Sequence, residues 1–207
     1  SGGSGEDVNL AFAAFGATDT IYASFDLVLP SGNPVNPDGN GMYFAHFKDG
    51  GFNFRARTGV LSPAGGGDYV LAVNGSSSDL GSGASWPSDL SFDTTYKVVI
   101  SWDAGTGEGR LWVDPTAMGD ASVAHVGGST GDLIESFAFR QGSDYTGFME
   151  VDNVIVGNTF DDVLPPPPVV PTVSEWGLIV MGLLFLIGGA LVLRRMSVQV
   201  VPQTASV

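Results

Sequence analysis

The chain has 207 residues, of which 22 are acidic and 8 are basic, so its formal net charge is −14. It has no cysteine and only two histidines, which excludes a disulfide framework, a thiolate zinc site and a cysteine nucleophile. A protein that binds nucleic acid needs a basic surface, so the charge balance argues against that class and we expect no nucleic acid partner.

The chain opens with the glycine- and serine-rich stretch SGGSG. This composition is typical of a flexible segment, so we assign residues 1–19 to a leader and a first sheet edge. The first residue is a serine rather than a methionine. Because an exported domain needs a signal peptide, we expect that such a peptide has been removed.

Residues 20–163 contain short runs of β-branched and aromatic residues, separated by glycine, asparagine, aspartate, serine and proline. This pattern predicts antiparallel strands joined by tight turns. In residues 96–103, large apolar side chains alternate with others, which places Trp102 on the predicted core face. The predicted strands are 21–29, 41–47, 52–58, 69–74, 95–103, 109–114, 133–140 and 147–156.

The order of these segments resembles that of concanavalin A-like, LamG-like domains. The resemblance rests on residues 22–25, 95–102, 111–115, 137–142 and 151–157. It implies an all-β fold, an antiparallel two-sheet jelly-roll sandwich over residues 20–163. That family includes lectins, glucanases and adhesive or structural modules, so the fold alone does not assign a function.

Catalysis is the first candidate activity. Retaining glycosidases of the resembling fold carry three acids on one strand, spaced Glu-x-Asp-x-x-Glu, of which two act as nucleophile and acid/base. The nearest match is Glu150 and Asp152, but Ile155 occupies the third position. The proton donor is then missing, so we predict a protein that is not an enzyme.

We interpret His46, within a predicted strand, as a hydrogen-bonded structural residue.

Calcium is the one cofactor that the residue types suggest. Carboxylate and carbonyl oxygens are the ligands that this hard cation prefers, and the resembling fold often carries a calcium ion. The same residue types are also the usual turn formers, which is the competing interpretation. The candidate metal ligands are Asp38, Asn40, Asp152 and Asn153.

Two tryptophans are candidates for contact with a carbohydrate. Trp86 lies in the predicted loop Ser-Trp-Pro, and Trp112 alternates with Leu111 and Val113, so that its ring is expected to face outward. Sugars stack on exposed aromatic rings. The competing interpretation is that a loop tryptophan such as Trp86 anchors its own loop by packing.

The C-terminal part predicts a stalk and a membrane anchor. Residues 164–175 include four consecutive prolines, which favour an extended spacer. Residues 176–193 are uncharged and mostly apolar, and as a helix they would span about 27 Å. That length is close to the thickness of a bilayer core, and a buried core helix is the less favoured alternative. Within residues 176–195 we expect Gly182, Gly188 and Gly189 to allow close helix contacts and Arg194 and Arg195 to face the cytoplasm, followed by a cytoplasmic tail at 196–207.

The junction of stalk and anchor resembles the IPTL-type C-terminal sorting signal, a relative of the PEP-CTERM signals. The matching segment covers residues 170–196 and ends on the arginine pair. The resemblance implies export to the bacterial envelope and processing by an exosortase-type protease. Eleven residues follow Met196, where the family usually ends close to its arginines. The residues that carry the motif are Pro171, Thr172, Ser174, Glu175, Trp176 and Gly177.

These features together predict a single-pass protein of the bacterial cell membrane, with a periplasmic or extracellular domain and a cytoplasmic C-terminus. Residues 1–164 hold 21 acidic and 6 basic residues, so anionic lipid should repel the domain. We expect a non-enzymatic structural or docking subunit of a larger membrane complex, of respiratory or photosynthetic type. Its expected partners are membrane lipid and other integral membrane subunits. The alternative is a carbohydrate-binding surface or matrix protein tethered by its sorting signal, with a glycan as partner.

Overall fold

A computed structural model describes residues 7–32, 41–128, 130–141 and 148–164, together with Leu183, Leu184 and Leu186. The chain divides into two compact units, Ser1–Pro165 and Pro166–Val207. All three described hydrophobic clusters lie in the first unit. Because this unit has its own core, it meets the usual criterion of an independently folding domain.

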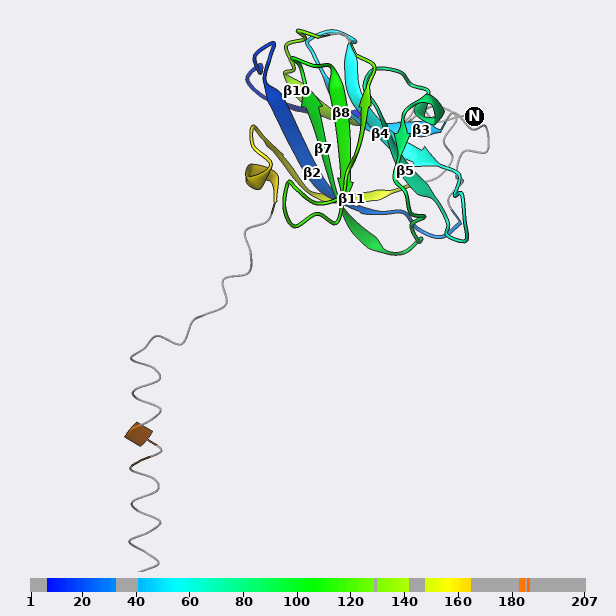
Figure 1. Ribbon diagram of the computed structural model, residues 1–207, viewed down its shortest axis with the longest axis vertical. Coiled ribbons are helices and arrows are strands. Elements are labelled where there is room, and N and C mark those ends of the chain that lie inside the picture. The colour runs from blue at the N-terminus through cyan, green and yellow to red at the C-terminus, as the bar shows by residue number, and fades with distance from the viewer. Residues whose placement is uncertain are drawn as a thin grey trace, which may run out of the picture. The chain divides into compact units, whose positions relative to one another are not determined.

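The first unit is a sandwich of two antiparallel sheets, as the sequence predicts (Figure 1). One sheet has the strand order β1-β10-β3-β4-β5-β6 and the other β11-β2-β7-β8-β9, and two short 3-10 helices complete the domain. The six-stranded sheet is made of β1 (Asp7–Ala11), β10 (Ser136–Arg140), β3 (Met42–Lys48), β4 (Phe54–Leu61), β5 (Val70–Asn74) and β6 (Ala84–Ser85). The five-stranded sheet is made of β11 (Glu150–Gly157), β2 (Thr20–Val28), β7 (Thr95–Asp103), β8 (Glu108–Val113) and β9 (Val123–Val126), and the helices are η1 (Leu80–Ser82) and η2 (Asp161–Val163).

Each predicted strand has a counterpart within a few residues, and strand 95–103 coincides with β7. Two observed strands, β6 and β9, were not predicted, and β1 lies within residues 1–19, for which a first sheet edge was expected without strand bounds. All three are edge strands of their sheets. An edge strand buries little, so its sequence carries only a weak alternation of apolar and polar residues. The all-exposed pattern of β1 illustrates this.

The core lies between the sheets and is rich in aromatic side chains. Phe25 from β2 contacts Phe44 from β3 and Phe139 from β10 with ring centroids 6.1 and 5.1 Å apart. Trp102 from β7 is fully buried in the same cluster, which confirms its predicted core position. The apolar faces of the two sheets therefore pack on each other across the sandwich.

A second cluster covers the outer face of the five-stranded sheet and corrects one sequence prediction. Trp112 does point away from the core, but its side chain is only 2% exposed. The ring of Phe160, just before η2, packs on it at a centroid distance of 5.0 Å, and Val163 and Tyr22 belong to the same cluster. The hydroxyl of Ser24 donates to the carbonyl of Val163. Trp112 is thus covered by the end of the domain and does not offer its ring to a ligand.

The predicted stalk and anchor lie almost wholly outside the described residues. This holds for the motif residues Pro171, Thr172, Ser174, Glu175, Trp176 and Gly177 and for Gly182, Gly188, Gly189, Arg194 and Arg195. Leu183, Leu184 and Leu186 are described, and they are helical and exposed. Within the part of the chain that the structure describes, no helix combines the length and apolarity needed to cross a bilayer.

Candidate functional site

The basic residues of the domain divide into two groups by their partners. Three of them form ion pairs of 2.6 to 2.7 Å with a carboxylate: Arg55 with Asp132, Lys97 with Asp26, and Arg110 with Glu108. The other three, Lys48, Arg57 and Arg140, make no ion pair with any described residue. These six are all the lysines and arginines of residues 1–164. In an acidic domain, half of the cations are therefore left without a described carboxylate partner.

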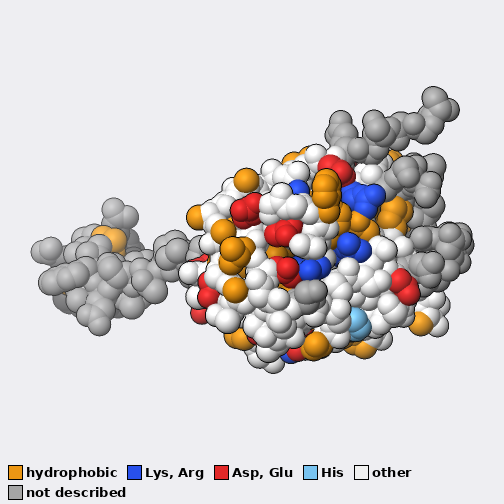
Figure 2. Space-filling model, turned by 90° about the horizontal axis from the view of Figure 1, so that it is seen from above, with side chains coloured by type: hydrophobic (Ala, Val, Ile, Leu, Met, Phe, Trp, Pro, Cys, Tyr) orange, Lys and Arg blue, Asp and Glu red, His pale blue; other side chains and the backbone are white. Residues whose placement is uncertain are grey.

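The three unpaired cations lie together on the outer face of the six-stranded sheet. They come from β3, β4 and β10, which are adjacent in that sheet. The core-facing side chains of the same strands, such as Phe44 and Phe137, point the opposite way. We call this surface the basic face and define it by Tyr43, His46, Lys48, Phe54, Arg57 and Arg140. Figure 2 shows one side of the molecule, on which Lys and Arg side chains lie among hydrophobic and acidic ones.

Two guanidinium groups stack on one tyrosine in the basic face. The guanidinium carbons of Arg57 and Arg140 lie 4.9 and 5.1 Å from the centroid of the Tyr43 ring. Arg140 also donates to the Tyr43 hydroxyl through Nη1, and Arg57 lies 5.3 Å from the ring of Phe54. The rings hold the two cations by cation–π attraction and leave guanidinium N–H groups for an anion.

Arg57 is an energetically costly residue in this position. Its Nε is buried and has no hydrogen-bond partner among the described residues. Burial lowers the pKa of Arg57, and the nearby cations Arg55 and Arg140 contribute to this lowering. A buried donor without a partner and two like charges close by both oppose folding. An anion beside the guanidinium would offset the repulsion between the like charges.

His46 lies beneath these cations and is 3% exposed. Its ring packs on Phe54 and Tyr43 at centroid distances of 4.3 and 5.7 Å. Burial lowers its pKa to about 3, and the positive charges of Arg57, Arg140 and Lys48 add to this effect. The imidazole is therefore neutral at neutral pH. His46 is buried as a structural residue would be, but its Nδ1 lacks the predicted hydrogen bond within the described part of the chain.

A shallow recess of about 430 Å³ opens on the basic face. Its polar lining includes Lys48 and Arg140 together with Asp7 and Asn9 of the edge strand β1. Asp7 is the cross-strand neighbour of Arg140 but forms no ion pair with it. Phe52, which is 88% exposed, lies at the rim, and its ring is 6.5 Å from that of Phe54. Cations beside an exposed aromatic ring suit a ligand that carries both acidic groups and apolar ring faces.

Trp86, the other predicted ligand-facing residue, is half-buried. Its ring packs against two of the hydrophobic clusters, and its backbone N–H donates to the carbonyl of Leu71 at 2.8 Å. These contacts fit the competing interpretation, in which Trp86 anchors its own loop. Arg57 and Arg140 lie 83 positions apart and meet only through the sheet, so no sequence motif connects them.

Two of the predicted calcium ligands occupy an irregular part of β11. The pairing of β11 with β2 shifts between Asp152 and Ile155, and Asn153 has a positive φ of 53°. The backbone N–H of Asn153 donates to Asp152 at 2.7 Å, and its amide Nδ2 donates to Asp26 at 2.6 Å. Asp26 also pairs with Lys97, so these polar groups already satisfy one another.

The calcium site stays a prediction. The described residues contain no group of three acidic or histidine side chains placed to hold a metal ion. Asp38 and Asn40, the other two candidate ligands, lie outside the described residues.

Comparison with solved structures finds similar sandwiches at low identity. A variant of alginate lyase Aly36B in complex with alginate tetrasaccharide has a TM-score of 0.49 and 14% identity over 74% of each chain. Alginate lyase from Corynebacterium sp. has a TM-score of 0.44 and 14% identity over 71% of this chain and 62% of its own. A sialidase of Trypanosoma rangeli, bound to sialic acid, has a TM-score of 0.40 and 16% identity over 69% of this chain and 21% of its own.

Comparison by sequence gives a result only for the tail. No curated protein matches the chain. The IPTL-CTERM motif matches residues 170–196, which are the boundaries expected from the sequence. The chain therefore carries a C-terminal sorting signal of the IPTL-CTERM type, and such a signal indicates an envelope-associated or secreted protein.

Proposed function

We propose that the protein is a non-enzymatic binding module of the bacterial envelope or its surroundings, and that the basic face binds an acidic polysaccharide. The observation that carries the proposal is the gathering of Lys48, Arg57 and Arg140 on one sheet face, without a described carboxylate partner. The rest of the domain is acidic and repels anions, so an anionic ligand is directed to this face.

The form of the face favours a sugar polymer over a small anion. A guanidinium group can hold a carboxylate through two parallel hydrogen bonds, and the Tyr43 ring keeps both arginines in place for this. The exposed ring of Phe52 at the rim suits the apolar face of a sugar. A recess open along a sheet can contact several sugar units of one chain at once.

The test compares charged and neutral polymers on the domain of residues 1–165. Polygalacturonate should bind, and a neutral β-glucan should not. Arg57→Gln and Arg140→Gln should each weaken polygalacturonate binding about tenfold, measured by calorimetry. Arg110→Gln is the matched control, because Arg110 is a paired arginine on the other sheet. Raising the salt concentration should weaken the binding, since exposed charges are screened.

Three results would contradict the proposal or a part of it. Equal affinity for the neutral glucan and for polygalacturonate would show that the cations do not contribute to binding. An effect of Arg110→Gln as large as that of Arg57→Gln would show that only net charge matters. Release of reducing sugar from either polymer would overturn the non-enzymatic part.

The proposed location rests on the tail. We infer that the apolar segment 176–193 holds the protein in the membrane as a single span, with the arginine pair in the cytoplasm and the domain outside. Docking on a larger membrane complex stays a prediction, because its support is the tail sequence alone. A glycan-binding module tethered to the envelope needs no such complex.

A further inference from the structure

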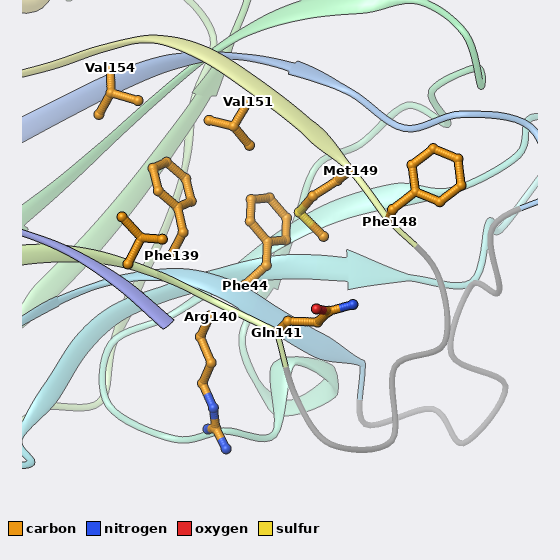
Figure 3. A pocket seen from close by; sticks show the side chains of 9 residues that line it. Phe44, Phe139, Arg140, Gln141, Phe148, Met149, Val151 and Val154 are labelled. Carbon is orange, nitrogen blue, oxygen red and sulfur yellow. The ribbon is translucent and has the colours of Figure 1, made fainter. Parts of the chain in front are cut away.

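A second cavity lies inside the open edge of the sandwich, between the two sheets. Val8, Phe44 and Phe139 line it from the six-stranded sheet, and Met149, Val151 and Val154 line it from the five-stranded sheet. The edge strands here are β1 and β11, neither of which has a further described strand beyond it. Figure 3 shows Phe44 and Phe139 on one side of the cavity and Met149 and Val151 on the other. We call this cavity the edge pocket.

The edge pocket has the size and lining of a ligand site. Its volume is about 430 Å³, within the range of about 300–1,000 Å³ usual for small-molecule sites. Of the residues that line it, only Arg140 and Gln141 are polar. Its rim carries exposed apolar side chains: Val8 is 60% exposed, Phe148 is 63% exposed and Val154 is 37% exposed. Exposed apolar side chains grouped around an apolar cavity favour an apolar ligand.

Arg140 connects this pocket to the basic face. Together with Phe139 it lines both the edge pocket and the recess of the basic face. In Figure 3 the stem of Arg140 lies by the pocket while its guanidinium points away from the apolar side chains. The stem of Arg140 borders the pocket and its charged end lies toward the basic face, so a ligand that fills the pocket can extend its polar end toward this charge. This arrangement fits an amphipathic anion.

We propose that the edge pocket binds the acyl chain of a lipid anion, with Arg140 holding the acidic headgroup. The acyl chain lies between Phe44, Phe139 and Val151, where it exchanges water for apolar contacts. The headgroup accepts hydrogen bonds from the guanidinium of Arg140. Within the described structure, this guanidinium donates only to the neutral hydroxyl of Tyr43. The domain would then bind a lipid anion through a guanidinium that it also offers to an acidic glycan.

The test uses cis-parinaric acid, a fluorescent long-chain fatty acid, with the domain of residues 1–165. Binding should be saturable, and stearate should displace the probe. Across a series of saturated fatty acids the affinity should rise about fourfold for each added CH₂ until the pocket is full. Val151→Trp fills the pocket and should weaken binding at least tenfold. Val126→Trp, at a 63% exposed position on β9, is the matched control and should bind as the unmodified domain does.

Two further variants keep the result decisive. If Val151→Trp does not fold, Val154→Gln at the exposed rim places a polar group in the entrance and should weaken binding. Arg140→Gln should weaken the binding of stearate but leave that of stearyl alcohol unchanged. The proposal is overturned if no saturable binding occurs, or if the folded pocket variants bind like the control. It is also overturned if the variants change the oligomeric state instead, since the pocket would then be a contact between copies.

The lipid proposal and the glycan proposal can fail separately. Val151→Trp leaves every residue of the basic face in place, so polygalacturonate binding should persist in this variant. Loss of fatty acid binding with retained polygalacturonate binding supports a separate lipid site. Fatty acid binding in a domain that fails to bind polygalacturonate refutes the glycan proposal alone.

Discussion

His46 is buried beside three cations, and this makes the stability of the domain depend on pH. Its pKa is about 3 in the folded state, against about 6.5 in an unfolded chain. Between these two values the unfolded state binds a proton that the folded state does not. The free energy of unfolding should therefore fall as the pH falls from 6.5 toward 3, by up to about 1.4 kcal/mol per pH unit from this residue.

Urea unfolding at pH 7, 5 and 4 measures this effect. His46→Gln should unfold with a smaller difference between pH 7 and pH 4 than the unmodified domain. The same substitution at His125, whose Nδ1 accepts from the backbone N–H of Gly75, controls for the loss of an imidazole. An unchanged pH dependence in His46→Gln would show that His46 is not the titrating group.

The residues of the basic face also show what a sequence can reveal about a site. The excess of acidic over basic residues is visible from composition alone. The outward placement of Tyr43 and Arg57 is not, because the pairing of β3 with β4 shifts register between Tyr43 and Phe47 and breaks the regular alternation. Which cations lack a carboxylate is not visible, because Arg55 finds Asp132 across 77 positions and Lys97 finds Asp26 across 71. Trp112 was misjudged for the same reason, since its cover, Phe160, is 48 positions away.

At the scale of elements, η2 and the residue before it cover the outer face of the five-stranded sheet. We call Phe160, Val163 and Leu164, which pack there on Tyr22 and Trp112, the plug. Phe160 is 3% exposed and contacts both Trp112 and Tyr22. Phe160→Ala should lower the free energy of unfolding by about 3–5 kcal/mol, because it opens a cavity and uncovers the tryptophan.

The change in Trp112 fluorescence and the urea midpoint together test the plug. Phe52→Ala is the matched control, since Phe52 is 88% exposed and its loss should change stability little. If Phe160→Ala is as stable as the control, the packing of Phe160 on Trp112 does not contribute to the free energy of unfolding.

Strands with two covered faces were the easiest elements to predict. The central strands β2 and β7 bury side chains over most of their length and match the predicted segments closely. The edge strands β6 and β9 were not predicted, because a strand exposed to solvent needs no regular apolar pattern, although the edge strand β11 was predicted as 147–156. The edge pocket was not predicted because its lining residues, from Val8 to Val154, lie far apart along the chain and meet only in the folded domain.

At the scale of the whole molecule, the two compact units should be separable. All three described hydrophobic clusters belong to Ser1–Pro165, so deleting residues 166–207 should leave the melting temperature of the domain unchanged. The deletion also removes the IPTL-CTERM motif, so the shortened protein should leave the membrane fraction.

Calorimetry and cell fractionation measure these two outcomes. Replacing Arg194 and Arg195 with lysine keeps the charge of the tail and serves as the control for fractionation. A lower melting temperature in the deletion variant would show that the tail takes part in the domain's core. Retention of the shortened protein in the membrane fraction would place the anchor elsewhere.

The packing of Leu164 against the cluster of Tyr22, Trp112 and Phe160 has a mechanical consequence. A force that pulls on the chain beyond residue 164 acts on this cluster first. It reaches the hydrogen-bonded strands only after the cluster has given way. The plug would yield first under tension, and the sandwich would keep its shape while the linker lengthens. If the tail holds the protein to the envelope as proposed, this cluster is the part of the domain that first resists extension of the linker.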